Sequence, residues 1–280
     1  MKNCCLTSLT RAAFLFVCCA GFVTSVAAQQ SHVLRVAADP NNLPFSNQRK
    51  EGFENKIAEL LARELNCKLE YHWHAQRRGF FRETLKSGDV DLVVGVPAHF
   101  DMALTTAPIY RSSFVFVARA DRQLHITSLD DVQLPKLKIG VQLIGNDGVD
   151  TPPAQAVAAR GLVQNVRGYT LYGDYTRENP PAQIMDAVVQ GDVDLAIVWG
   201  PLAGFYAKRS RVALEIVPVQ PQKDHALYFA FDIAIGVQKQ NRALKDKIDN
   251  VLAAHHDEIE SILDAYNVPR VGVASKRASL

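Results

Sequence analysis

The chain is poor in cysteine, and its few cysteines are unevenly placed. Of the five cysteines in 280 residues, only Cys67 lies beyond residue 19. The others are Cys4, Cys5, Cys18 and Cys19. A chain that loses its first residues therefore has no pair of cysteines for an internal disulfide, and its hydrophobic core alone must stabilise it. About 250 remaining residues are enough for such a core in two compact units.

The chain also lacks an excess of charge of one sign. Its 31 Lys and Arg residues nearly balance its 29 Asp and Glu residues, which leaves a formal net charge of +2. Lys2 and Arg11 are the only charged residues before Arg35, so their removal brings the net charge to zero. A neutral chain gives no electrostatic reason to expect nucleic acid or an anionic membrane as a partner.

Long apolar runs are scarce. The most prominent lies between Ala12 and Val26, follows Lys2 and Arg11, and ends at the small residues Val-Ala-Ala of 26–28. This pattern is typical of a secretory signal peptide with its cleavage site. The run is too short for a membrane span. We expect residues 1–28 to be removed and the rest to work as an exported protein without membrane insertion.

Common catalytic and metal-binding motifs are missing. The chain contains no Gly-x-Ser-x-Gly, His-Glu-x-x-His or Cys-x-x-Cys. His72 and His74 share one face of a predicted strand, a spacing that allows metal binding. A solvent-facing strand side is the more common explanation of that spacing. We therefore expect no enzymatic activity, metal or bound cofactor, although a fold alone never decides function.

A five-residue sequence occurs twice in this chain. Gly-Asp-Val-Asp-Leu stands at 88–92 and again at 191–195. In both places an amphipathic helical pattern ends at the glycine and an apolar strand follows. The pattern predicts two similar α/β lobes with parallel strands and a ligand cleft between them. Chance recurrence of a common turn sequence is the alternative.

Strand and helix patterns alternate along the rest of the chain. We predict strands at 33–38, 68–73, 91–96, 113–118, 138–141, 165–171, 194–199 and 228–237. We predict helices at 53–65, 78–86, 181–189 and 242–266, and one that begins at Thr151, where a capping residue precedes Pro152. Two strands would cross between the lobes near 118–121 and 220–228 and form a hinge. The first lobe is then 31–120 plus 224–270, the second is 121–223, and 271–280 is a flexible tail.

This order of elements resembles the type II periplasmic binding protein fold, an α/β fold with two doubly wound lobes and a two-strand hinge. Segments 34–39, 44–46 and 52–58 are similar to the amino-acid receptors of solute-binding family 3. Such receptors usually hold the ligand carboxylate with an arginine nine residues before the proline of the next strand. Counting back from Pro108 reaches His99. An ordinary amino-acid receptor is therefore not expected, unless Arg78 or Arg111 supplies this contact.

Longer stretches point to a narrower family. They are 38–47, 52–58, 76–80, 95–106, 139–148, 151–154, 172–175 and 198–204. These stretches resemble the quinoprotein-dehydrogenase-associated solute-binding-like proteins, the MoxJ/XoxJ family. The resemblance implies a periplasmic protein that activates or matures a PQQ-dependent alcohol (methanol) dehydrogenase, with its cytochrome c as a second candidate partner and a guest larger than an amino acid. The alternative function is a receptor of an ABC transporter for a small polar solute, and the third hypothesis is a cofactor-handling enzyme.

The residues that we expect at the cleft lie at predicted strand ends, at helix starts and in these motifs. In the first lobe they are Asp39, Asn41, Asn42, Phe45, Glu54, Arg77, Arg78 and Arg111. In the second lobe they are Asn146, Asp147, Thr151 and Trp199. Strand ends of open α/β sheets commonly contact ligands, but the segment from Asp39 to Asn42 is also a good turn sequence whose polar groups can serve only that turn.

The charged and aromatic candidates have alternatives of the same kind. Arg77 and Arg78 open a predicted helix, where positive charges are unfavourable because they oppose the helix dipole. This favours the binding of an acidic guest; a solvated pair of arginines is the alternative. Trp199 can stack on a guest or belong to the core. Asn146 and Asp147 lack the ligand spacing of a calcium loop, so we interpret them as a turn near the cleft.

Overall fold

Hydrogen bonds connect ten strands of the described chain into one path. Its order is β4–β1–β5–β14–β7–β10–β8–β9, with β6 paired to β14 and β11 to β7. The computed structural model describes residues 32–77, 79–144, 150–170, 175–176 and 178–272. The predicted signal peptide and most of the predicted tail lie outside these ranges, as do Arg78, Asn146 and Asp147. Within them, no helix has the length and apolar character needed to cross a membrane.

The strands follow the sequence pattern closely. The path consists of β1 (Val33–Ala38), β4 (Lys68–Trp73), β5 (Leu92–Pro97), β6 (Leu104–Thr105), β7 (Tyr110–Arg119), β8 (Ile139–Leu143), β9 (Val166–Thr170), β10 (Leu195–Trp199), β11 (Leu214–Pro218) and β14 (Ala230–Val237). Two short pairs lie outside it, β2 (Asn41–Asn42) with β3 (Ser46–Asn47) and β12 (Lys223–Asp224) with β13 (Leu227–Tyr228). The helices are α1 (Phe53–Glu64), α2 (Phe80–Glu83), α3 (Pro152–Ala159), α4 (Gln183–Gln190), α5 (Gly200–Arg209), α6 (Arg242–Ala254) and α7 (His256–Ala265).

Strands β7 and β14 connect the two halves of the sheet, and we call them the crossing strands. The first half holds β4, β1, β5 and β6, and the second half holds β10, β8, β9 and β11. The two crossing strands pair with each other antiparallel, from Ala230 opposite Ser113 to Ile233 opposite Tyr110. From Phe114 onward, β7 pairs instead with β10 and β11 of the second half. The lobe boundaries at 120/121 and 223/224 stay a prediction.

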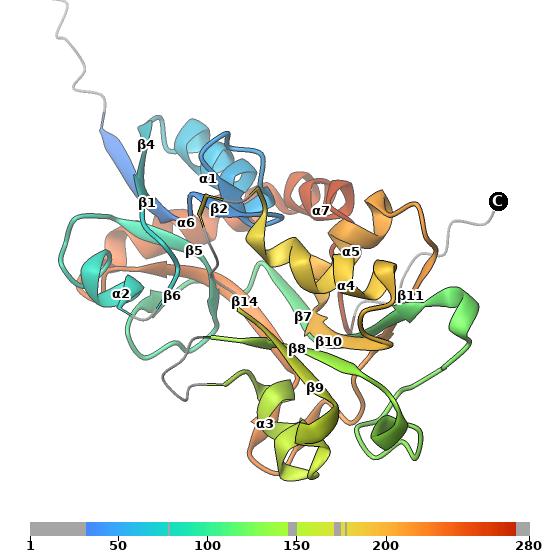
Figure 1. The fold of residues 1–280 in the computed structure, drawn as a ribbon. Coiled ribbons are helices and arrows are strands. Elements are labelled where there is room, and N and C mark those ends of the chain that lie inside the picture. The colour runs from blue at the N-terminus through green and yellow to red at the C-terminus, as the bar shows by residue number, and fades with distance from the viewer. Residues whose placement is uncertain (1–31, 78, 145–149, 171–174, 177, 273–280) are drawn as a thin grey trace, which may run out of the picture. The chain divides into compact units, whose positions relative to one another are not determined.

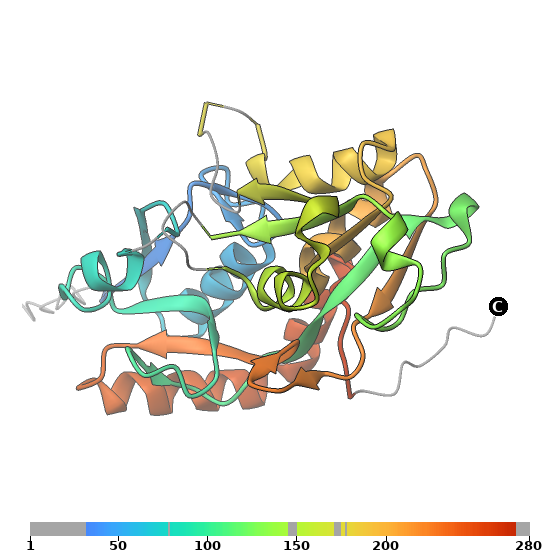
Figure 2. The same cartoon turned by 60° about the horizontal axis from the view of Figure 1, so that its bottom comes forward.

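Helices cover both faces of the first half. On one face, Phe53 and Ile57 of α1 share a core with Ile248 of α6 and Leu263 of α7. Figure 2 shows α6 running along β14, and side chains of both elements belong to this core. On the other face, a smaller core forms around Phe80 of α2. The helix predicted at 53–65 is confirmed, because its apolar residues recur at helical spacing and face this core.

The second half is also covered on both faces. Figure 1 shows α3 on one side of β8, β9 and β10, and α4 and α5 on the other. Val157 of α3 packs in one core, and Val188 of α4 with Leu202 of α5 packs in the opposite one. Helix α3 begins as predicted, with the Thr151 hydroxyl accepting a hydrogen bond from the backbone N–H of Ala154 at 3.4 Å. The mixed α/β fold class expected from the sequence is confirmed.

Two predicted helices differ from the structure. The helix expected at 78–86 contains only Phe80–Glu83 of α2. It ends early because Thr84 leaves helical geometry, with φ −121° and ψ −80°, while its hydroxyl bonds the carbonyl of Phe80 at 2.6 Å. The single helix expected at 242–266 is broken at His255 into α6 and α7. The break lets both helices pack on α1.

Candidate functional site

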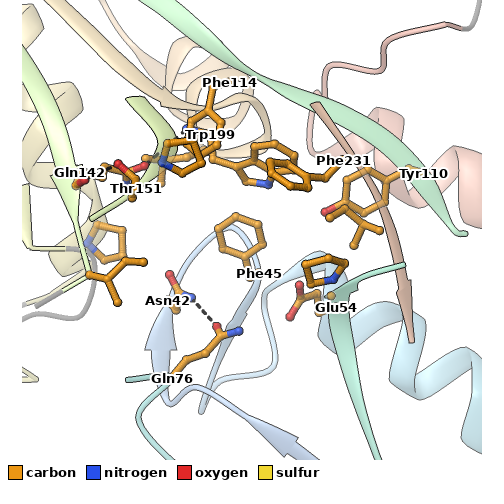
Figure 3. Close-up of a pocket in the computed structure, with 17 residues that line it drawn as sticks. Asn42, Phe45, Glu54, Gln76, Tyr110, Phe114, Gln142, Thr151, Trp199 and Phe231 are labelled. Atoms are coloured by element: carbon orange, nitrogen blue, oxygen red, sulfur yellow. Dashed lines mark hydrogen bonds between the residues drawn. The ribbon is translucent and has the colours of Figure 1, made fainter. Parts of the chain in front are cut away.

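A cavity of about 280 Å³ lies where the two halves of the sheet meet (Figure 3). We call it the pocket. Residues from both halves and from both crossing strands line it, among them the aromatic residues Phe45, Tyr110, Phe114, Trp199 and Phe231. Its volume lies just below the usual range for small-molecule sites, about 300–1,000 Å³. A side chain or a small organic molecule therefore fits inside, whereas the sequence resemblance implied a guest larger than an amino acid.

The turn after β1 forms one wall of the pocket. The buried carboxylate of Asp39 accepts hydrogen bonds from the backbone N–H of Asn41 at 2.8 Å and of Gln76 at 2.7 Å. The phenol of Tyr175, from the second half, also donates to this carboxylate at 2.8 Å. Asn42 then donates its side-chain amide to the Gln76 side chain at 3.2 Å (Figure 3). Asp39 thus holds the turn and also ties it to Gln76 and Tyr175, so its carboxylate serves more than the turn itself.

The start of α1 places Phe45 and Glu54 in the pocket. The backbone N–H of Glu54 donates to the carbonyl of Phe45 at 3.0 Å. Gly52 permits this approach, because a Cβ atom at its position would lie 1.9 Å from the Phe45 carbonyl oxygen. The Asn55 side chain accepts from the backbone N–H groups of Asn47 and Gly52, at 3.2 and 3.1 Å, which holds the turn against the helix.

Glu54 has an unusual environment for a carboxyl group. Its side chain lines the pocket beside Gly95, whose lack of a side chain leaves room for it. Burial, and then the negative charge of Asp39, raise the pKa of Glu54 to about 8. Burial and the nearby Glu54 also raise the pKa of Tyr110 well above its usual value. Both groups are therefore mainly protonated at pH 7.

Aromatic rings form another wall of the pocket. The Trp199 ring packs edge-on against Phe114, with ring centroids 5.2 Å apart, and against Phe231, with centroids 6.0 Å apart. Figure 3 shows these three rings in a row with Phe45 below Trp199. Trp199 is partly accessible and also packs against both large cores. Trp199 therefore belongs both to the core packing and to the pocket wall, and its stacking on a guest stays a prediction.

Polar groups of the second half are already hydrogen-bonded. The Gln142 side chain accepts from the backbone N–H of Trp199 at 3.4 Å. The Thr151 hydroxyl donates to the Gln142 carbonyl at 2.7 Å while it caps α3. Both residues line the pocket, but these bonds give them a structural task.

The structure brings together some of the residues that the sequence placed at the cleft. Those lining the pocket are Asn42, Phe45, Glu54, Thr151 and Trp199. Asp39 and Asn41 stand behind this wall, where the Asn41 side chain accepts from the backbone N–H of Asn179 at 3.3 Å. Their assignment as binding residues remains a proposal.

Two of the three arginine candidates, Arg77 and Arg111, are described, and neither lines the pocket. Arg77 is exposed and follows Gln76, which lines the pocket. Arg111 bonds the Asp232 carboxylate at 2.9 Å, and neither arginine is among the described lining residues. Arg78, Asn146 and Asp147 are outside the described residues.

Several pocket residues were not predicted from the sequence. Gln76 and Gln142 stand at or just beyond the carboxyl ends of β4 and β8, so the strand-end rule could have found them. Tyr110, Phe114 and Phe231 lie on the crossing strands. Tyr110 and Phe114 lie an even number of positions apart on β7, as do Phe231 and the lining residue Ile233 on β14, so each pair shares one strand face. Only the tertiary pairing shows which face meets the pocket.

The comparisons with known proteins agree with this architecture. The family model of bacterial extracellular solute-binding proteins, family 3, matches residues 34–268. Protein MoxJ of Methylorubrum extorquens is 30% identical over 256 residues, which is 86% of this chain and 83% of that protein. Protein MoxJ of Paracoccus denitrificans is 28% identical over 279 residues, 91% of this chain and 97% of that protein.

A solved structure extends the agreement to three dimensions. The crystal structure of the periplasmic binding protein XoxJ from Methylobacterium extorquens matches with a TM-score of 0.69 and 34% identity. The match covers 86% of this chain and 100% of XoxJ. The chain therefore belongs to family 3 of the bacterial extracellular solute-binding proteins and, within it, to the MoxJ/XoxJ family.

Proposed function

We propose that this protein works in the periplasm, after cleavage of its signal peptide, as a binding protein that helps to activate or mature a PQQ-dependent alcohol (methanol) dehydrogenase. The observation that carries the proposal is the family match, which spans most of this chain and most of each relative. The cytochrome c of that enzyme is a second candidate partner.

The pocket and its rim are the proposed contact site for the dehydrogenase. Aromatic residues dominate the energetics of many protein interfaces, and Trp199 with Phe45 offers such a surface. The cavity of about 280 Å³ is large enough for one or two side chains of a partner. A transient complex needs only a small interface around this anchor. Arg77 is exposed next to the wall residue Gln76 and would lie at the rim.

Gene deletion tests the proposal. Specific activity is measured as dehydrogenase activity per unit of dehydrogenase protein, and we expect it to fall in the deletion strain. Complementation with the Trp199→Ala or Arg77→Ala variant should restore less activity than the original gene. Arg167→Ala is the matched control, since Arg167 is also exposed but lies on β9, outside the described pocket lining. Unchanged specific activity in the deletion strain would overturn the proposal.

A receptor of an ABC transporter is the second candidate function. The observation that favours it is the size of the pocket, which suits one small solute. Its mostly apolar and aromatic lining argues against a strongly polar one. Loss of uptake of one solute in the deletion strain, with dehydrogenase activity unchanged, would establish this candidate in place of the first.

A further inference from the structure

The pocket combines aromatic rings with a carboxyl group. The rings of Phe45, Tyr110 and Trp199 line the same cavity as the Glu54 carboxyl (Figure 3). The face of an aromatic ring is electron-rich and attracts cations, most strongly for tryptophan. Among the described lining residues there is no lysine, arginine or histidine that could neutralise Glu54. The described surface of the pocket therefore favours positive charge.

The second carboxylate strengthens this preference. Asp39 stands behind the wall and acts on Glu54 through its negative charge. Three donors already bond the Asp39 carboxylate: the backbone N–H groups of Asn41 and Gln76 and the phenol of Tyr175. The Asp39 carboxylate is therefore held in place, and Asp39 is not among the described residues that line the pocket. Glu54 is the carboxyl group that a ligand can reach.

Other ligand charges fit the described pocket poorly. An anion would face Glu54 and the negative charge of Asp39 with no described cation to bind it. A neutral polar ligand would find two of the amide oxygens engaged, because the Gln76 oxygen accepts from Asn42 and the Gln142 oxygen accepts from the backbone N–H of Trp199. A cation with apolar substituents matches both the rings and the carboxyl group.

We propose that the pocket binds an organic ammonium group, placed between the Glu54 carboxylate and the rings of Phe45, Tyr110 and Trp199. The group belongs either to a free small amine or to a lysine side chain of a partner protein. The chemistry is the same for both sources, so this inference stands on the pocket and not on the proposed dehydrogenase partner.

Proton release follows from this arrangement. The Glu54 pKa of about 8 means that the carboxyl is mainly protonated at neutral pH. A bound cation favours the ionised form, so binding below pH 8 must release a proton. The titratable groups that face or act on Glu54 in the described structure are Asp39, Tyr110 and Tyr71. The two tyrosines stay neutral in this range because their own pKa values are raised, to about 12 for Tyr71.

A matched pair of probes tests the charge of the ligand. Choline and 3,3-dimethylbutan-1-ol have nearly the same shape, and only choline is charged. Calorimetry on the mature chain should show choline binding at least about tenfold tighter, as expected for a cation held by rings and a carboxylate. Below pH 8, titrations in buffers of different ionisation enthalpy should show proton release on binding, and the affinity for choline should rise with pH. Equal affinity for the two probes, or no choline binding up to millimolar concentration, would overturn the proposal.

Variants test the residues. Glu54→Gln keeps the shape of the side chain and should weaken choline binding by about tenfold or more and abolish proton release. Glu59→Gln is the control, because this glutamate lies on the same helix, pairs with Lys56 at 3.0 Å, and is not among the described lining residues. Trp199→Leu, checked for folding by urea denaturation, supplies a second variant that should lower the affinity. Unchanged affinity in both variants would contradict the assigned site.

The source of the ammonium group is tested with a second pair. Nα-acetyl-lysine methylamide represents a lysine in a protein segment, and Nα-acetyl-norleucine methylamide lacks its charge. Tighter binding of the lysine probe than of choline identifies a protein segment as the carrier, and the reverse order identifies a free amine. Either order supports the ammonium site, and failure of the dehydrogenase assay would leave this result unaffected.

Discussion

Asp91 and Asp194 make equivalent hydrogen bonds in the two halves of the sheet. The Asp91 carboxylate accepts from the backbone N–H of Arg35 at 2.8 Å, and the Asp194 carboxylate accepts from that of Lys138 at 2.9 Å. In both pairs the partner lies 56 residues earlier in the chain. The backbone N–H of each aspartate also donates to the carbonyl of the same partner, at 2.8 and 2.9 Å. The repeated Gly-Asp-Val-Asp-Leu sequence thus fastens β5 beside β1 and β10 beside β8, which favours duplication over chance.

This relationship predicts the effect of removing either carboxylate. Asp194→Ala leaves the N–H of Lys138 without this acceptor and the Arg122 guanidinium without its partner at 2.8 Å. An unsatisfied group of this kind costs about 1–3 kcal/mol. We expect the free energy of unfolding, measured in urea, to fall by about that amount in Asp194→Ala and in Asp91→Ala. The control is Asp192→Ala in the same turn, where the side chain is exposed. A loss as large in the control would refute the assigned role.

A second prediction concerns pH and stability. The pKa of Glu54 is about 8 in the folded chain, against an ordinary value of 4.5. Between these values the folded state keeps a proton that the unfolded state has released, so the free energy of unfolding must decrease as pH rises from about 4.5 to about 8. The slope from Glu54 is at most about 1.4 kcal/mol per pH unit, reached where the folded state holds one proton more than the unfolded state.

Denaturation in urea at several pH values measures this effect. The difference in unfolding free energy between the original chain and Glu54→Gln isolates the contribution of this one carboxyl group. From pH 5 to pH 8, we expect the unfolding free energy of the original chain to fall relative to that of Glu54→Gln. Above pH 8 the difference should level off. Glu59→Gln, on the same helix but outside the described pocket lining, is the matched control. A pH-independent difference for Glu54→Gln would show that its carboxyl titrates normally.

A third prediction concerns Gly95 and Gly88. Both have positive φ values, 85° and 90°, so an alanine at either position is strained by about 1–2 kcal/mol. Only Gly95 also faces a side chain, because a Cβ atom there would lie 2.0 Å from Oε1 of Glu54. No atom lies within 4 Å of the corresponding Cβ at Gly88. Gly95→Ala should therefore destabilise the chain more than Gly88→Ala, as measured in urea.

A double-mutant cycle assigns the excess to Glu54. In the background of Glu54→Ala, the collision is removed, and Gly95→Ala should cost no more than Gly88→Ala. An excess that persists without the glutamate side chain would mean that the backbone of β5, and not Glu54, requires the glycine.

Local signals in the sequence were sufficient for part of the fold. Strands β1 and β4 occupy the predicted residues, and Thr151 caps α3 as expected. These features could be predicted because strand patterns and helix caps depend on only a few neighbouring residues. Helix α5 and strand β11 were not predicted. The start of α5 is apolar and follows β10 without a break, so the sequence does not show where the strand ends and the helix begins. Strand β11 is stabilised by pairing with β7, which lies far away in the sequence.

The site depended even more on distant contacts. Phe45 and Trp199 were found because strand ends and turns commonly meet ligands. Tyr110 and Phe231 were missed because the pairing of β7 with β14 decides which of their alternate faces meets the pocket. Arg111 was expected at the cleft, yet the same pairing sets it opposite Asp232, which binds its guanidinium. Such cross-strand partners are set by register between segments more than a hundred residues apart.

The last prediction concerns free amino acids. Receptors that bind them hold the α-carboxylate with a positively charged group, and each charge-assisted hydrogen bond of this kind contributes about 1.5–3 kcal/mol. His99 occupies the position that this arginine has in such receptors; it is exposed and is not among the described lining residues. Arg111 is occupied by Asp232 at 2.9 Å. We therefore expect no micromolar binding of any common α-amino acid in calorimetry.

A sharper comparison uses one amino acid and its decarboxylated form. Lysine and 1,5-diaminopentane share the ammonium chain, but lysine brings a carboxylate toward Glu54 and the charge of Asp39. The diamine should bind more tightly than lysine, because the described pocket lining provides no cation for the carboxylate. If lysine bound at micromolar concentration and the diamine did not, a cation outside the described lining would have to hold the carboxylate. Arg111→Ala and Arg78→Ala would then identify it, since the affinity for lysine would fall in the variant that removes the responsible arginine.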